Sequence, residues 1–385
     1  MPPRLRHQGR HPGDAARRSD HRALTTDPPH LRLLLVRLRL VGDVTFTTPA
    51  IRALRRHFPA ATIDYLVEAA AAPVVRHNPH LSSVIEVTRP RGWRRLAADL
   101  ALARTLRRRR YDVAIDFHGG PRSAWLVRAS GAPTRIGYAI PGRQWAYTTR
   151  VAWHPHLEPP RHSVLNQWDL LGPLGLPPAD PDRDPVEMVA GSEASTAAAD
   201  RLARAGIDAT TPLVVLHVSA SNPFRRWPRA SFARLAAGLA AGDPARRIMI
   251  TAGPSEADAA DAVAAEAAQL AGGAAAGIVR SGEPTLEELE VIVSRARLFI
   301  GGDSGPLHVA ATTGVPIVAL FGPTLPARSM PWRAATIPAV ALEPGPLPCR
   351  PCHQRRCVPG DFRCLTAITP DAVLAAATSL LEGRR

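Results

Sequence analysis

The sequence has no lysine, only four cysteines among 385 residues, and no long apolar run. No apolar segment approaches the roughly 20 residues that a helix needs to span a bilayer, so we expect no membrane-spanning helix. Near the N-terminus no sufficiently long apolar segment follows a basic one, so we expect no secretory signal and a cytoplasmic protein. The apolar content is 45%, which excludes a wholly disordered chain.

All 48 basic residues are arginines, and the formal net charge is +15. Part of this excess reflects a coding bias towards arginine, yet it still favours anionic partners such as phospholipid headgroups or phosphorylated glycans. No zinc-finger or RNA-binding aromatic pattern accompanies the arginines, so we expect no nucleic-acid partner. The densest basic segment runs from Arg104 to Asp112. We interpret it as a solvated helix end, with a surface that contacts anionic lipid as the next alternative.

Strand-like and helix-like segments alternate along most of the chain, which is typical of parallel sheets in α/β domains. We expect a disordered basic leader over residues 1–30, a first α/β domain over 31–180 and a linker over 181–211. A second α/β domain follows over 212–345, and a cysteine segment with a closing helix over 346–385. Two such halves predict a cleft at the carboxyl ends of their strands. The expected strands are Leu31–Leu38, Thr62–Glu68, Ser83–Val87, Tyr111–Gly119, Pro212–Val218, Arg247–Gly253, 277–282, Ala296–Ile300 and Val315–Gly322.

Gly42 and Asp43 stand where the first strand is expected to turn into the first helix. Asp43 fits two interpretations equally well. Its carboxylate can cap the helix, or it can point from the sheet edge into the cleft and act as a general base towards a hydroxyl.

Small residues follow the first strand of the second domain at Ser219, Ala220 and Ser221. Such a loop allows a ligand to approach the backbone closely, and the neighbouring Arg225 can neutralise a phosphate. The alternative is a solvated pair formed by Arg225 and Arg226 ahead of a helix.

The stretch GGDSGPLHVAATTG, Gly301 to Gly314, predicts a strand, a tight turn and a short helix. Asp303 or Ser304 can simply cap that helix. The turn can instead offer its amide groups, with Gly305 allowing close approach, to a phosphate-bearing ligand. His308 is interpreted either as a hydrogen-bonded structural residue or as a contact for that phosphate, and not as a general acid.

These three blocks together resemble glycosyltransferase family 9, the heptosyltransferases of lipopolysaccharide core synthesis. The blocks are VRLRLVGDVTFTTPAIRALRRHFP, FRRWPRASFARLA and FIGGDSGPLHVAATTGVPIVALFGPT, in the family's order. The resemblance implies a GT-B fold, in which two Rossmann-like domains, the first for the acceptor and the second for the nucleotide sugar, face each other across a cleft. It also implies that the last helix crosses back to the first domain.

The resemblance also implies an inverting transfer from ADP-heptose without a catalytic metal or other cofactor. In that family pattern Asp43 is the base, and Arg225, Asp303, Ser304, Gly305 and His308 lie at the donor diphosphate. Gly42, Ser219 and Ser221 belong to loops near the donor or acceptor. The partners it implies are a nucleotide sugar and an anionic glycan or glycolipid acceptor. The basic surface of the chain suits peripheral contact with an anionic membrane, at the inner face of the cytoplasmic membrane.

The four cysteines are grouped at Cys349, Cys352, Cys357 and Cys364. This spacing can hold a structural zinc ion or an iron–sulfur cluster, and we expect a small zinc knuckle there. Free thiols are the alternative, since a cytoplasmic setting disfavours disulfides.

Two other functions stay open at this point. One is a transferase that uses another nucleotide sugar to build a different cell-surface glycan. The other is a non-catalytic nucleotide-binding or glycan-binding protein of the same fold, which would have no need for a base opposite the donor.

Overall fold

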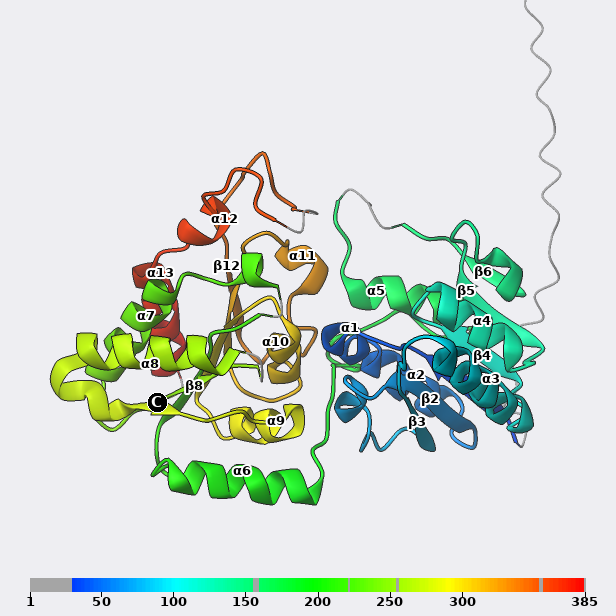
Figure 1. The fold of residues 1–385 in the computed structure, drawn as a ribbon, viewed down its shortest axis with the longest axis horizontal. Helices are drawn as coiled ribbons and strands as arrows, with labels where there is room; N and C mark the ends of the chain where they lie inside the picture. The colour runs from blue at the N-terminus through cyan, green and yellow to red at the C-terminus, as the bar shows by residue number, and fades with distance from the viewer. Residues whose placement is uncertain (1–29, 155–158, 221, 254–255, 353–355, 384–385) are drawn as a thin grey trace, which may run out of the picture.

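The computed structural model describes residues 30–154, 159–220, 222–253, 256–352 and 356–383. Within these ranges the chain forms two α/β domains that lie side by side (Figure 1), each around a six-stranded sheet. The predicted leader lies outside the described residues apart from His30. No helix in the described ranges is long and apolar enough to cross a membrane.

The first domain has a parallel sheet with the strand order β3-β2-β1-β4-β5-β6. Its strands are β1 (Arg32–Val36), β2 (Thr62–Glu68), β3 (Ser83–Val87), β4 (Val113–Asp116), β5 (Thr134–Tyr138) and β6 (Thr149–Val151). Its helices are α1 (Val41–Thr45), α2 (Thr48–His57), α3 (Trp93–Arg108), α4 (Pro121–Ala129) and α5 (Ser163–Trp168), with 3-10 turns η1 (Ala72–Val74), η2 (Gln144–Ala146) and η3 (Asp169–Leu174).

The second domain repeats this plan with the strand order β12-β11-β10-β7-β8-β9. Its strands are β7 (Leu213–His217), β8 (Arg247–Thr251), β9 (Ile278–Arg280), β10 (Leu298–Gly302), β11 (Ile317–Leu320) and β12 (Ala339–Leu342). Its longer helices are α6 (Ser192–Arg204), α7 (Arg229–Ala241), α8 (Ala257–Ala271), α9 (Leu286–Ser294) and α13 (Pro370–Glu382). The shorter ones are α10 (Gly305–Ala310), α11 (Pro326–Ser329) and α12 (Arg363–Thr366), with 3-10 turns η4 (Pro223–Arg225) and η6 (Gly272–Gly277).

The central strands β1, β4, β7 and β10 are largely apolar, as is typical of parallel strands that are buried on both faces of a sheet. Successive side chains of a strand point to opposite faces. In β1, Leu33 and Leu35 therefore enter the core on one face, whereas Leu34 and Val36 enter the core on the other. Because both faces of β1 are buried, the strand contains an unbroken run of apolar residues, and this run predicted it from the sequence.

The predicted α/β architecture is confirmed, and the strands β2 and β3 have the predicted bounds. The pattern missed the strands β5, β6 and β12 and the helices α4 and α6. It was also wrong about the turn at Gly42 and Asp43, which lie within the short helix α1. The domain boundaries stay predictions, with α6 falling inside the segment expected to be a linker.

The last helix does not return to the first domain in the way we expected. Helix α13 has its main contacts with α7, β10 and β11, and it lies beside α7 in the left half of Figure 1, on the side away from the first domain. Its apolar side chains Val373 and Ala377 complete the core of the second domain. The apolar face of α13 is therefore buried within the second domain. The expectation that the last helix crosses back to the first domain is wrong.

The segment around Asp184 ties the two domains together. Its buried carboxylate accepts hydrogen bonds from the Arg56 guanidinium of α2 at 2.7 and 3.1 Å. Trp332 of the second domain donates its indole N–H to the Asp184 carbonyl at 2.9 Å and accepts from the Val186 amide at 3.0 Å. These contacts hold α2 of the first domain and the Trp332 segment of the second domain to the same stretch of chain.

Candidate active site at the domain interface

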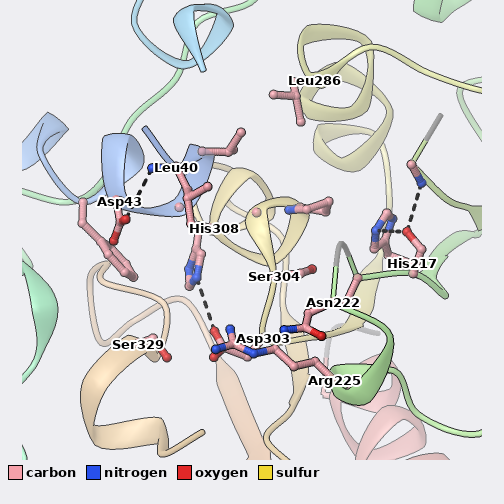
Figure 2. A pocket seen from close by; sticks show the side chains of 18 of the residues that line it. Leu40, Asp43, His217, Asn222, Arg225, Leu286, Asp303, Ser304, His308 and Ser329 are labelled. Carbon is pink, nitrogen blue, oxygen red and sulfur yellow. Dashed lines mark hydrogen bonds and ion pairs between the residues drawn. The ribbon is translucent and has the colours of Figure 1, made fainter. Parts of the chain in front are cut away.

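A cavity of about 520 Å³ lies between the two domains, in the size range of small-molecule sites. Its walls come from segments that directly follow β1, β7 and β10 (Figure 2), with Leu40 and Asp43 on one side and Ser304, Asn222 and Arg225 on the other. The structure therefore brings together the three sequence blocks. The predicted residues that line it are Gly42, Asp43, Ser219, Arg225, Asp303, Ser304, Gly305 and His308.

Asp43 is held in place but accessible. Its carboxylate accepts the Leu40 amide at 3.4 Å, near the start of α1, and pairs with the Arg37 guanidinium at 2.5 Å. The Asp43 side chain keeps 37% of its surface exposed, whereas that of Arg37 keeps 14%. Both interpretations of Asp43 therefore fit the geometry, because the carboxylate supports the helix start and also faces the cavity.

His308 crosses from the second domain to touch the first. Its ring packs against the Phe46 ring with centroids 4.5 Å apart, and a methyl group added at Gly42 would lie only 2.4 Å from its Cδ2 atom. The Nε2 atom lies 3.4 Å from the Asp303 carboxylate (Figure 2). The absence of a side chain at Gly42 thus lets the two domains meet at this ring.

Asp303 and Ser304 form the turn that ends β10. Although burial opposes ionisation, the hydrogen bond from His308 holds the pKa of Asp303 below its usual value. Ser304 is the residue before α10, yet its side chain makes no capping hydrogen bond and its hydroxyl donates to the Gly302 carbonyl at 3.2 Å. Simple capping by Ser304, one of the alternatives weighed from the sequence, is not what the structure shows.

The two neighbouring arginines before Trp227 have different partners. Arg226 pairs with the Glu256 carboxylate and donates to the Ala220 carbonyl at 2.9 Å. Arg225 lines the cavity beside Asp303 (Figure 2), and its buried Nε atom finds no hydrogen-bond partner among the described residues. The positive charge available to a ligand is therefore that of Arg225.

His217 is a cavity residue that the sequence analysis missed. It ends β7, where its Nδ1 atom lies 3.0 Å from the Thr251 hydroxyl and its Nε2 atom 3.0 Å from the Ser219 hydroxyl. Ser219 also accepts the Gly253 amide at 3.0 Å. Burial lowers the pKa of His217 to about 4, so the ring is neutral at pH 7. The sequence feature that could have identified His217 is its position as the one polar residue at the end of the apolar strand β7.

The remaining cavity residues were not singled out as site residues from the sequence. They come from α1 and its flanks, the α5 start, the loops after β7 and β8, the α9 start, α10 and α11, and they are Leu40, Val41, Phe46, Ser163, Ala220, Asn222, Gly253, Glu256, Leu286, Pro306 and Ser329. Ser221, which the sequence analysis placed in the same loop, lies outside the described residues.

The cysteine segment lies apart from this cavity. All four thiols are free. The pKa of Cys364 is raised, chiefly by burial and to a smaller extent by the neighbouring thiols of Cys349, Cys357 and Cys352. Among the described residues, no three His, Cys, Asp or Glu side chains are grouped so that they could hold a metal ion. The structure therefore does not support the zinc knuckle expected at Cys349, Cys352, Cys357 and Cys364.

Comparison with known proteins agrees with this geometry. The pattern of glycosyltransferase family 9 (heptosyltransferase) matches residues 100–360. The chain is 27% identical to lipopolysaccharide heptosyltransferase 3 of Escherichia coli K12 over 350 residues, covering 89% of this chain and 96% of that protein. It is 25% identical to lipopolysaccharide heptosyltransferase 1 of Pseudomonas aeruginosa over 344 residues, covering 85% and 87% of the two chains.

Solved structures share the whole architecture. A family 9 glycosyltransferase from Veillonella parvula superposes with a TM-score of 0.80 at 23% identity, covering 92% of this chain and 98% of that one. The Escherichia coli ADP-heptose heptosyltransferase II gives 0.73 at 20% identity, covering 92% and 99%. Two domains of this kind, each around a parallel six-stranded sheet, form the GT-B architecture. The chain belongs to glycosyltransferase family 9.

Proposed function

We propose that this enzyme transfers a heptose from ADP-heptose, with inversion, to a sugar hydroxyl of a lipopolysaccharide-core-like or other lipid-linked glycan. The observation that carries the proposal is the shared cavity, in which Asp43 of the first domain faces Arg225, Ser304 and His308 of the second. The names of the relatives support the heptose and its ADP carrier.

Asp43 is the proposed general base. Its carboxylate faces the cavity, and its partners among the residues that the structure describes are the Leu40 amide and the Arg37 guanidinium. In the proposed step it accepts the proton of the acceptor hydroxyl while that oxygen attacks the anomeric carbon from the face opposite the diphosphate. Such proton transfer contributes roughly 10²–10⁴-fold to a rate.

Arg225 and the turn after β10 are proposed to receive the leaving diphosphate. A guanidinium with an unpaired buried Nε atom can donate to phosphate oxygens as their negative charge grows. His308 adds a ring whose Nδ1 atom is buried without a hydrogen-bond partner among the described residues. We propose that Asp303 orients this ring and that Arg225 supplies the positive charge, so that transfer needs no metal.

A donor screen tests this proposal. Thermal shift and calorimetry with ADP-, UDP- and GDP-sugars compare the binding of each to the purified chain. A donor at 100 times its Kd stabilises the folded state by about 2.7 kcal/mol, so we expect a clear rise in Tm with ADP-heptose. A shift with UDP-sugars and none with ADP-sugars would contradict the heptose assignment and leave the fold unaffected.

A further inference from the structure

Helix α3 presents large apolar side chains to solvent. Trp93 is 75% exposed, Leu96 69% and Leu100 48%. Their spacing of three and four residues puts them on one face of the helix. Within the described residues, α3 buries Leu106 and Asp99, and its Leu102 packs partly buried against the same core as Leu106. The stripe of Trp93, Leu96 and Leu100, here called the α3 stripe, is therefore left uncovered by the rest of the domain.

The same face of α3 continues as a basic surface. Arg104, Arg107 and Arg108 are exposed along the C-terminal half of the helix, and they lie within about 60° of Trp93 around its axis at roughly 100° per residue. Arg94 lies with its guanidinium carbon 5.8 Å from the Trp93 ring centroid. The acidic residue of α3, Asp99, is buried and paired with Arg122 at 2.7 Å. The exposed charge of this face is thus positive.

The α3 stripe begins at the sheet edge that carries the proposed base. Arg122 bridges the Asp99 carboxylate of α3 to Glu68, the last residue of β2, at 3.1 Å, and donates to the carbonyl of Thr88 just after β3 at 3.1 Å. Asp43 follows β1, the neighbour of β2, at the same carboxyl edge. Figure 1 shows α3 beside α4 on the first domain, away from the second domain.

We propose that this α3 face docks the enzyme on an anionic bilayer surface, with the α3 stripe in the headgroup region and Arg104, Arg107 and Arg108 against lipid phosphates. An amphipathic surface with a tryptophan, leucines and arginines binds membranes in this way. The inference rests on the proposed function at one point. If the acceptor is lipid-linked, it would approach the cavity from the membrane surface to which the α3 face docks the enzyme.

Vesicle co-sedimentation of the full chain tests the proposal. The vesicles contain phosphatidylcholine alone or with phosphatidylglycerol, and they carry no acceptor. We expect binding to the anionic vesicles only, and weaker binding at high salt. Each basic residue near an anionic surface changes affinity roughly fivefold, so Arg104→Gln with Arg107→Gln and Arg108→Gln should weaken binding roughly 100-fold.

Matched variants distinguish binding through the α3 face from binding through exposed charge or exposed apolar surface elsewhere on the protein. Trp93→Ser with Leu96→Ser and Leu100→Ser should abolish vesicle binding. Leu270→Ser, on an equally exposed leucine of α8, and Arg204→Gln with Arg234→Gln and Arg295→Gln, on exposed arginines of the second domain, should leave it unchanged.

Three outcomes overturn the proposal: no binding by the wild type, equal binding by the α3 variants, or a wild-type dimer that the α3 variants convert to monomers. In the last case a second copy covers the stripe. The Tm shift with ADP-heptose is measured on the same samples. It should be unchanged in the α3 variants, so a failure of membrane docking and a failure of the donor assignment are told apart.

Discussion

Replacing Gly42 with alanine tests how closely the two domains must meet. The new Cβ atom would lie 2.4 Å from His308 Cδ2 and 3.2 Å from its Nε2. Ordinary contact begins near 3.4 Å, so the ring must move by about 1 Å (3.4 − 2.4). The His308 side chain is only 6% exposed and lies between Phe46 and Asp303, which leaves it little room.

The expected magnitude follows from two opposing effects. Alanine is the better helix former by about 1 kcal/mol, whereas overpacking a filled site costs about 1–3 kcal/mol. We therefore expect a net loss of at most about 2 kcal/mol in the free energy of unfolding, the overpacking cost less the gain in helix propensity. A displacement of about 1 Å at a positioned group can reduce a rate about 100-fold. Expressed as free energies, the loss in transfer rate should therefore exceed the loss in stability.

Urea denaturation and a transfer assay with ADP-heptose measure both effects. Gly172→Ala is the control, because that glycine also lies in a helical turn and a methyl group there meets nothing within 4 Å. In a His308→Ala background the overpacking penalty should disappear, which a double-mutant cycle detects as a coupling of about 1–3 kcal/mol. If Gly42→Ala is as stable and active as the wild type, the close contact does not constrain the site.

Two further predictions concern charge. Arg225→Gln should reduce the transfer rate roughly 100-fold, since one lost contact to a developing charge costs about 3 kcal/mol. Arg229→Gln, on an exposed arginine paired with Glu266, is the control, and equal rates for both variants would remove Arg225 from the donor site. Stability should fall as pH drops from about 6.5 towards 4, because burial lowers the pKa of His162 and His217 to about 4 while the unfolded chain takes up protons near 6.5. The loss is about 1.4 kcal/mol per pH unit for each histidine. A urea midpoint that is unchanged between pH 7 and pH 5 would contradict it.

Local sequence patterns predicted the parts of the fold that depend on continuous apolar runs. β1 and β7 were found because both of their faces are buried. β6, with three residues of which none is fully buried, gave no such signal. The same limit explains α13, whose apolar face was visible in the sequence, whereas its choice of the second domain depends on contacts with α7 that are distant in the chain.

The candidate site shows a similar division. Asp43, Arg225 and the turn from Asp303 to Gly305 stand in blocks whose residue types suggest their chemistry. The contact between Gly42 and His308 joins positions 266 residues apart (308 − 42) and depends on the packing of whole domains. The different partners of Arg225 and Arg226 likewise depend on Glu256, which a linear pattern does not place.

The role of Asp43 is the central claim, and Asp43→Asn tests it most directly. Asparagine keeps the size of the side chain but cannot accept a proton at neutral pH. Asp169→Asn is the control, because Asp169 is similarly exposed, at 32%, and is also paired with an arginine, Arg161. We predict that Asp43→Asn binds ADP-heptose with an affinity near that of the wild type and transfers heptose roughly 10²–10⁴-fold more slowly. Transfer by Asp43→Asn at the rate of the Asp169→Asn control would contradict the account.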